Sequence, residues 1–151
     1  MSGPKNKSMP LTDEWLSDAI EAAALTHIRE RSNSSLQGLY RALVSGRLLV
    51  PLFSDLTTHE GKTDVPVRCF RLPSGEGCIP AFTSVQRLLE WDPGGSLYAE
   101  MPCQKLFVMA TGMLDIDAIF VNYSHEKGVP KGMITRPEFE LLAQGVFPKN
   151  G

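Results

Sequence analysis

Three kinds of side chain in this sequence could do chemistry: cysteines, histidines and paired carboxylates. The cysteines are Cys69, Cys78 and Cys103, an odd number without a C-x-x-C pair, so neither a disulfide framework nor a zinc site is indicated. Cys103 follows Pro102 at the expected start of a helix, where free N–H groups and the helix dipole would lower a thiol pKa. Cys103 is therefore a candidate reactive thiol. A packed, unreactive cysteine is favoured over it, because no partner histidine is in view.

The histidines and the acidic residues give no sign of a metal or catalytic centre. His27, His59 and His125 are far apart in the chain, and a metal site would need them to converge. Asp115 and Asp117 precede an expected strand, which is typical of turn residues. The motifs of serine hydrolases, P-loop proteins and zinc proteases are missing. We expect no metal, no cofactor and no catalytic residue, and a non-enzymatic protein is favoured over an enzyme.

The remaining candidates lie where three expected strands end, at Phe53, Phe82 and Asn122. If these strands run parallel in one sheet, their carboxyl ends share an edge, where open α/β sheets bind ligands. Thr83 and Ser84 would add a helix N-terminus that can hold an anion. The alternative is that the aromatic residues are core and the polar residues are helix caps, and for Ser84 the cap is favoured. The candidate ligand-binding residues are Phe53, Phe82, Thr83, Ser84, Trp91, Asn122 and Ser124.

Composition narrows the class of protein. The 151 residues carry 15 Lys and Arg against 17 Asp and Glu, a formal net charge of −2, which argues against nucleic acid as the main partner. No apolar run approaches the ~20 residues that span a bilayer. The first residues carry two lysines without the apolar stretch of a signal peptide. We therefore expect a soluble, cytoplasmic, globular protein that binds neither nucleic acid nor membranes.

The elements that must position these residues begin with two helices. Residues 1–10 are polar and are expected to form a disordered tail, followed by one domain over 11–147. The first helix is predicted to start at Thr12 and to end near residues 32–34. For the second helix, Ser34 and Gln37 predict a capping box, and Gly46 is expected to close it in a left-handed conformation. Together they predict an αα-hairpin.

After the hairpin, the pattern changes to short apolar runs separated by turns. Strands are predicted at 48–53, 65–72, 77–82, 96–101 and 118–121, a mobile loop at 55–64, and helices from Ser84, Pro102 and Thr135. The strands 65–72 and 77–82 should form an antiparallel hairpin. Thr135 and Glu138 predict a second capping box, and Gly145 the end of the last helix. The fold class is mixed α/β (α+β): one domain, an N-terminal αα-hairpin and then a mixed sheet of about five strands with flanking helices.

Four short segments together resemble the N-terminal domain of the SseB (enhanced serine sensitivity) proteins. They are Leu49-Val50-Pro51-Leu52, Ile79-Pro80-Ala81-Phe82-Thr83-Ser84, the helix from Leu88 to Trp91, and Ile119-Phe120-Val121-Asn122. The Phe-Thr-Ser motif before a Leu-x-x-Trp helix is the most specific combination. The resemblance covers about residues 36–144.

The resemblance implies a bacterial, cytoplasmic protein without an established enzyme activity. Two features depart from it: Asn122 is followed by Tyr123-Ser124-His125 instead of the family's Asn-Pro, and the sequence ends before the C-terminal domain that SseB proteins often carry. We expect a non-enzymatic binding or regulatory module acting through protein–protein contacts. The partner would be another protein, or a second copy in a homodimer, at a strand edge or the αα-hairpin. The alternative is a small-molecule-binding protein or cryptic enzyme that uses the strand-end pocket.

Overall fold

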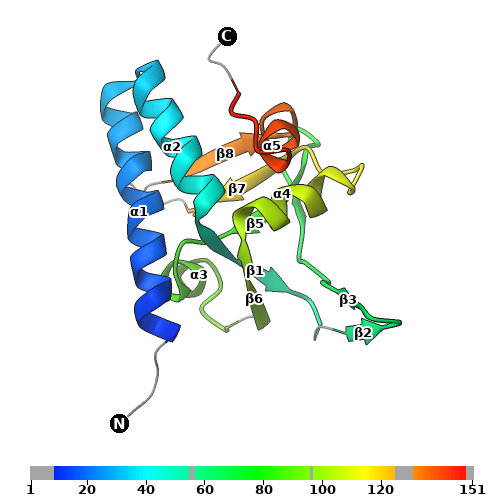
Figure 1. Cartoon of the computed structure of the whole chain (residues 1–151). Helices are drawn as coiled ribbons and strands as arrows, with labels where there is room; N and C mark the ends of the chain where they lie inside the picture. Colours follow the sequence, from blue (N-terminus) through cyan, green and yellow to red (C-terminus); the bar gives the residue numbers. More distant parts are fainter. Residues whose placement is uncertain (1–8, 55–56, 96, 125–130, 149–151) are drawn as a thin grey trace.

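Two long helices stand side by side along one flank of the molecule in the computed structural model (Figure 1). The structure describes residues 9–54, 57–95, 97–124 and 131–148. Helix α1 spans Met9–Glu30 and helix α2 spans Asn33–Ser45, so the predicted αα-hairpin is confirmed. Residues 9 and 10 belong to α1, which corrects the predicted tail, while residues 1–8 lie outside the described range. Pro10 is tolerated because the first turn of a helix needs no N–H there.

The start of α2 differs from the prediction by two residues. Ser32, not Ser34, is the N-cap: its hydroxyl accepts the N–H of Ser35 at 2.9 Å, and the Ser35 hydroxyl accepts the N–H of Ser32 at 3.1 Å. Gly46, at the other end, has φ −100° and is extended instead of left-handed. It is tightly placed for another reason, because an added Cβ would lie 2.8 Å from the carbonyl oxygen of Ala42.

Two sheets follow the hairpin. β1 (Arg47–Leu52) pairs antiparallel with β6 (Leu97–Pro102). A four-stranded sheet has the order β4-β5-β7-β8, with β4 (Phe70–Arg71), β5 (Gly77–Ala81), β7 (Ala118–Val121) and β8 (Gly132–Thr135). β5 and β7 are parallel, and the other neighbours in this sheet are antiparallel. A mixed sheet with an antiparallel hairpin was predicted and is present. The predicted strands 48–53 and 96–101 form the separate sheet of β1 and β6 instead of joining it, β4 is much shorter than the predicted strand 65–72, and β8 was not predicted.

The segment predicted as a loop at 55–64 contains a small hairpin instead. β2 (Thr57–His59) and β3 (Lys62–Asp64) pair antiparallel around Glu60 and Gly61. Both turn residues have positive φ, 53° and 77°, as a type I′ hairpin turn requires. Residues 55 and 56 lie outside the described residues. The turn was missed because glutamate, unlike asparagine or aspartate, is not a typical first residue of such turns.

Three shorter helices complete the fold: α3 (Val85–Trp91), α4 (Cys103–Thr111) and α5 (Arg136–Ala143). The predicted capping box of α5 is confirmed, since the Glu138 carboxylate accepts the N–H of Thr135 at 2.9 Å. Gly145 has φ 77°, as predicted for the residue after this helix. The main core lies between the hairpin, the sheet and helices α4 and α5, with fully buried Leu48, Val50, Ile79, Leu106, Phe107, Ile119, Phe139 and Leu142. No helix of the described residues is long and apolar enough to cross a bilayer.

Candidate functional site: a groove under the helical hairpin

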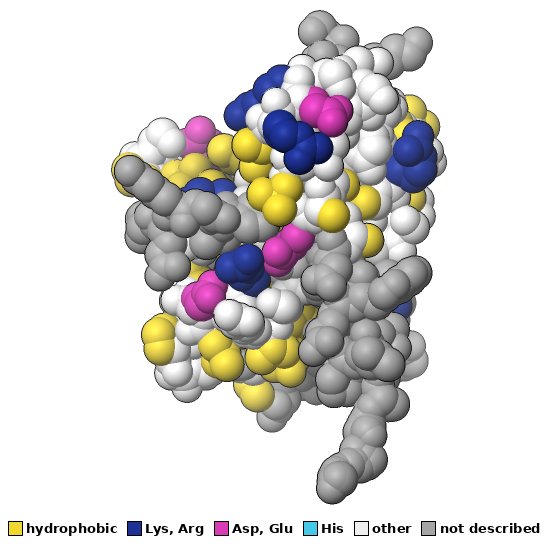
Figure 2. Space-filling view, turned by 90° about the vertical axis from the view of Figure 1, so that its left-hand side faces the viewer, with side chains coloured by type: hydrophobic (Ala, Val, Ile, Leu, Met, Phe, Trp, Pro, Cys, Tyr) yellow, Lys and Arg dark blue, Asp and Glu magenta, His cyan; other side chains and the backbone are white. Residues whose placement is uncertain are grey.

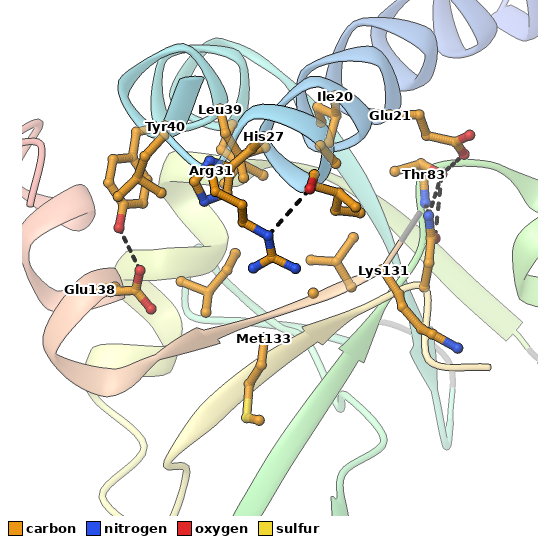
Figure 3. Close-up of a pocket in the computed structure, with 18 residues that line it drawn as sticks. Ile20, Glu21, His27, Arg31, Leu39, Tyr40, Thr83, Lys131, Met133 and Glu138 are labelled. Carbon is orange, nitrogen blue, oxygen red and sulfur yellow. Dashed lines mark hydrogen bonds between the residues drawn. The ribbon is translucent and has the colours of Figure 1, made fainter. Parts of the chain in front are cut away.

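A cavity of about 320 Å³ opens between the helical hairpin and the β8 side of the sheet (Figure 3). We call it the hairpin groove. Its walls are the second half of α1, the part of α2 from Leu36 to Leu43, the ends of β5 and β7, residues 131–134, and Glu138 of α5. Much of the lining is apolar, from Ile20, Leu36, Leu39, Leu43, Val121 and Ile134. The volume and the mixture of apolar walls with a few polar groups are typical of binding sites.

Arg31, directly after α1, turns its guanidinium toward the cavity (Figure 3). It has φ 52°, a left-handed conformation that costs an ordinary L-residue about 1–2 kcal/mol. Its N–H donates to the carbonyl of His27 at 2.8 Å, and its Nε donates to the carbonyl of Ile28 at 3.3 Å. It forms no ion pair within the described residues. The residue that ends α1 in a left-handed conformation is thus also the one that presents a cation to the groove.

A second cation lies on the sheet side of the groove. The ammonium of Lys131 donates to the carbonyl of Ser124 at 2.6 Å. Arg31 and Lys131 come from segments that are far apart in sequence, yet both line the same cavity. The guanidinium of Arg31 beside an apolar wall favours a ligand that carries a carboxylate or another anion together with apolar surface.

Glu21 is an acidic group of the groove, and its charge is balanced within the protein. Its carboxylate lies 3.3 Å from the guanidinium of Arg87 and accepts the hydroxyl of Thr83. Thr83 is held in turn by Asn122, whose side-chain oxygen accepts the Thr83 N–H at 3.1 Å and whose amide donates to the Thr83 hydroxyl at 3.0 Å. Asn122 is buried and left-handed, with φ 58°. This network fixes one end of the groove and leaves Glu21 satisfied.

The other end of the groove is closed by a tyrosine–glutamate pair. The hydroxyl of Tyr40 donates to the Glu138 carboxylate at 2.5 Å. Burial, and then the neighbouring carboxylate, raise the pKa of Tyr40 above its ordinary value. The phenol therefore stays neutral and keeps Glu138 hydrogen-bonded. His27, also on the wall, has its Nδ1 2.8 Å from the hydroxyl of Ser35.

Two of the candidate residues from the sequence, Thr83 and Asn122, line the groove together. They meet because β5 and β7 are parallel and in register at Ala81 and Val121, as the strand-end prediction required. Ser124 follows on the same chain segment, and its carbonyl accepts a hydrogen bond from Lys131. It is not among the residues that line the cavity.

Three further candidate residues lie outside the groove and have packing or capping roles: Phe82, Ser84 and Trp91. Phe82 is fully buried in a second apolar cluster with Leu49 and Leu88, and its ring lies 5.4 Å from that of Trp91. Ser84 caps α3, accepting the N–H of Arg87 at 3.2 Å. The Phe-Thr-Ser and Leu-x-x-Trp segments therefore contribute mainly to this apolar cluster. Among their residues, only Thr83 lines the groove.

Phe53 does not join the other two strand ends, so this part of the strand-end prediction is wrong. β1 meets Phe82 through an antiparallel bridge at Leu49, which sends the end of β1 away from the ends of β5 and β7. Phe53 is 71% exposed. The direction of β1 depends on contacts between distant residues, which its local sequence does not contain.

The environment of Cys103 does not favour a reactive thiolate. The thiol is fully buried, and burial raises its pKa to about 12 against a smaller opposing effect of Arg47. Because the thiolate is the nucleophile, the packed and unreactive alternative describes Cys103 better. The exposed cysteine is Cys69. Within the described part of the chain, no three His, Cys, Asp or Glu side chains are grouped so as to hold a metal ion.

Sequence reasoning missed several residues of the groove, among them both of its Lys and Arg residues, Arg31 and Lys131. An arginine near the C-terminal end of a helix is usually interpreted as a favourable charge for the helix dipole. The residues next to Arg31 do not predict its left-handed backbone. Lys131 precedes β8, a four-residue strand without an alternating apolar pattern. Of the two groove residues with positive φ, only Asn122 could be anticipated from its residue type, because asparagine adopts positive φ more readily than arginine does.

Comparison with known proteins gives one match. Residues 21–135 match the model of the family described as SseB protein N-terminal domain. No curated protein and no solved structure matches the chain. The matched range runs from Glu21 on α1 to Thr135 at the end of β8, so it includes the residues that line the hairpin groove except Ile20 and Glu138.

Proposed function

Since this chain belongs to the family of SseB N-terminal domains, we propose that it is a non-enzymatic binding module. In this proposal, the hairpin groove receives a short segment of a partner protein that carries an acidic side chain. The partner segment lies with its apolar side against the hairpin and with its carboxylate at Arg31. Binding, and not chemistry on the ligand, is then the function of the site.

The single observation that carries the proposal is the placement of Arg31. Its guanidinium faces an apolar-lined cavity, its backbone is left-handed, and within the described residues it has no carboxylate partner. A guanidinium offers several donors in a fixed plane, which suits bidentate binding of a carboxylate. The left-handed backbone of Arg31 ends α1, as residues directly after a helix often do, so it is the guanidinium facing the cavity that points to a ligand.

The surface around the mouth of the groove also supports a macromolecular partner. On the face that carries α1, hydrophobic side chains lie beside Lys and Arg side chains (Figure 2). Leu25 and Ile28 of α1 are 48% and 45% exposed, and Met133 of β8 is 45% exposed. Apolar residues at the rim of a groove extend the contact area beyond what a small molecule would reach.

The test is selection of phage-displayed random heptapeptides on the immobilised protein. We expect enrichment of peptides that contain Asp or Glu, bound less tightly as NaCl is raised from about 50 to about 500 mM because salt screens the ion pair. Arg31→Gly should weaken the selected peptides by roughly tenfold or more, since a charge-assisted hydrogen bond is lost. Glycine is chosen because it tolerates the left-handed backbone.

The matched control is Arg29→Ala. Arg29 lies in the last turn of the same helix, pairs with Glu30 at 3.4 Å and does not line the groove. This variant has the same change in net charge and should bind the peptides as the wild-type protein does. Equal binding by Arg31→Gly and wild type, or enrichment without acidic residues, would contradict the proposal.

A small carboxylic acid is the second candidate ligand, and the volume of the cavity is the observation in its favour. Thermal-shift measurements with a panel of mono- and dicarboxylic acids and amino acids, serine included, test it. Stabilisation of the wild-type protein but not of Arg31→Gly by one of these compounds, without peptide binding, would favour this second function.

We also propose that the protein works in a reducing compartment, the bacterial cytoplasm. Cys69, Cys78 and Cys103 are all free thiols, and Cys69 is exposed. An exposed free thiol is usual where disulfides do not form and a liability where they do. Fractionation of the native cells followed by immunoblotting would test the compartment.

A further inference from the structure

Strand β8 brings an open backbone edge to the hairpin groove. It is the last strand in the order β4-β5-β7-β8, and within the described residues it pairs only with β7. Residues 131–134 line the groove, opposite α1. At Gly132 the face of the strand is open as well, because an added Cβ would meet nothing within 4 Å.

The register shows which backbone groups of β8 face outward. The N–H of Arg136 donates to the carbonyl of Asp117 at 2.8 Å, so these residues form a hydrogen-bonded pair. Such pairs alternate along antiparallel strands, which directs the polar groups of Ile134 toward β7 and those of Met133 away from it. Thr135 agrees with this phase, because its N–H turns outward to the Glu138 carboxylate.

We propose that the partner segment binds as an additional strand along β8, with its backbone paired to Met133 and a carboxylate at Arg31. This inference rests on the proposed function and specifies its partner: an extended peptide, and not a helix or a folded surface. Strand addition to an exposed edge is a general mode of peptide recognition, in which backbone hydrogen bonds supply affinity and alternate side chains supply specificity.

The two faces of the added strand predict the sequence pattern of the partner. Alternate side chains of a strand point to the same face, and the face toward the hairpin meets both the apolar lining and Arg31. The partner should therefore carry an apolar residue and an acidic residue two positions apart. Side chains between them face the solvent and are unrestricted. The four residues of β8 limit the segment to a few residues.

The first test compares Met133→Pro with Met133→Ala. Proline removes the outward N–H of residue 133 and leaves the bonds to β7 in place, whereas alanine removes the same side chain and keeps the N–H. With the fluorescein-labelled heptapeptides selected on the wild-type protein, we expect Met133→Pro to weaken binding about tenfold, as measured by fluorescence anisotropy, and Met133→Ala to change it about twofold at most. Equal affinities of the two variants would overturn the inference.

The second test uses wild-type protein and so does not depend on the folding of Met133→Pro. Each selected peptide is N-methylated at one backbone position at a time. A paired strand turns every second N–H toward its neighbour, so we expect an alternating pattern, with about tenfold losses at every second position of the bound segment. Uniform tolerance of N-methylation would show that the backbone is not paired.

The outcomes separate this inference from the function on which it rests. Peptides that need Arg31 but tolerate both Met133→Pro and N-methylation would overturn strand addition and leave the binding function standing. Failure to select any acidic peptide would overturn both. A dimer in light scattering that Met133→Pro dissociates would assign the edge to a second copy of this chain and overturn the peptide as its partner.

Discussion

An arginine lies at the C-terminal end of α4 and another at that of α1, and the two guanidinium groups differ in how many hydrogen bonds they make within the protein. At the end of α4, Arg136 donates to the carbonyls of Ala110, Thr111 and Met113. It also donates to the carbonyl of Ile116 and pairs with Glu140. At the end of α1, Arg31 gives one bond, from Nε to a carbonyl, and turns the rest of its guanidinium to the hairpin groove.

The difference separates an arginine that holds the fold together from one that is available to a ligand. The guanidinium of Arg136 donates to carbonyl groups at the end of α4 and beyond it, where a helix leaves part of its hydrogen-bonding capacity unused, and it lies 5.1 Å from the ring of Phe139. Its donors are used. Most donors of the Arg31 guanidinium make no hydrogen bond within the described residues and lie beside the apolar lining of the hairpin groove, at a residue with a left-handed backbone. Removal of each arginine should therefore change different properties.

The largest expected effect on stability belongs to Arg136→Ala. This change removes the side-chain donor of the Thr111 and Ile116 carbonyls and the ion pair with Glu140, while the carbonyls of Ala110 and Met113 keep backbone donors, so we expect the free energy of unfolding to fall by about 3 kcal/mol. Urea unfolding followed by tryptophan fluorescence measures it. Arg136→Lys is the matched variant: it keeps the charge but cannot reach the same set of carbonyls, so it should recover only part of the loss. If the free energy of unfolding falls by less than about 1 kcal/mol in Arg136→Ala, Arg136 does not stabilise the fold more than an exposed ion pair would, and the proposed difference from Arg31 is wrong.

A smaller loss is expected at the closed end of the groove, from Tyr40→Phe. It removes a buried hydrogen bond to Glu138 and should lower the free energy of unfolding by about 1–2 kcal/mol near neutral pH. The pKa of Tyr40 is raised in the folded protein from about 10, so the unfolded chain loses the phenolic proton first. The tyrosine contribution is then complete below pH ~10 and declines above it.

Unfolding curves of the two proteins between pH ~7 and ~11 test this sign, because the advantage of wild type over Tyr40→Phe should shrink as the pH passes ~10. Tyr98→Phe is the control, since Tyr98 is 46% exposed and far from this pair. It should follow the wild-type protein throughout. A constant difference between wild type and Tyr40→Phe would mean that the hydrogen bond does not govern the ionisation of Tyr40.

The fold was largely predictable where local chemistry decides it. Ser84 as a cap and the Thr135–Glu138 capping box follow from residues three apart, and both are present. The start of α2 was wrong by two residues because consecutive serines offer the same motif twice. The hairpin of β2 and β3 was missed because its turn begins with Glu60. Local rules fail where the sequence permits two registers or uses an atypical turn residue.

The site was predictable only in part, because it is made by distant segments. Thr83 and Asn122 could be placed together from the ends of two buried strands. Phe53 could not be excluded, since the direction of β1 is set by its bridge to Phe82. Arg31 reaches the groove through a left-handed residue after α1, and no local pattern marks that conformation in an arginine. The groove therefore became visible only with the tertiary structure.

The smallest expected change in stability, and the one opposite in sign, comes from Arg31→Gly. Glycine adopts the left-handed conformation without the steric cost of an L-residue, about 1–2 kcal/mol, but loses about 0.5–1 kcal/mol of backbone entropy on folding. The free energy of unfolding should rise by roughly 0.5–1 kcal/mol, as measured beside Arg136→Ala in the same urea series. The same variant should lose the acidic peptides. A residue whose removal stabilises the protein and weakens peptide binding is retained for binding, whereas a neutral or destabilising Arg31→Gly would mean that Arg31, like Arg136, serves the stability of the fold.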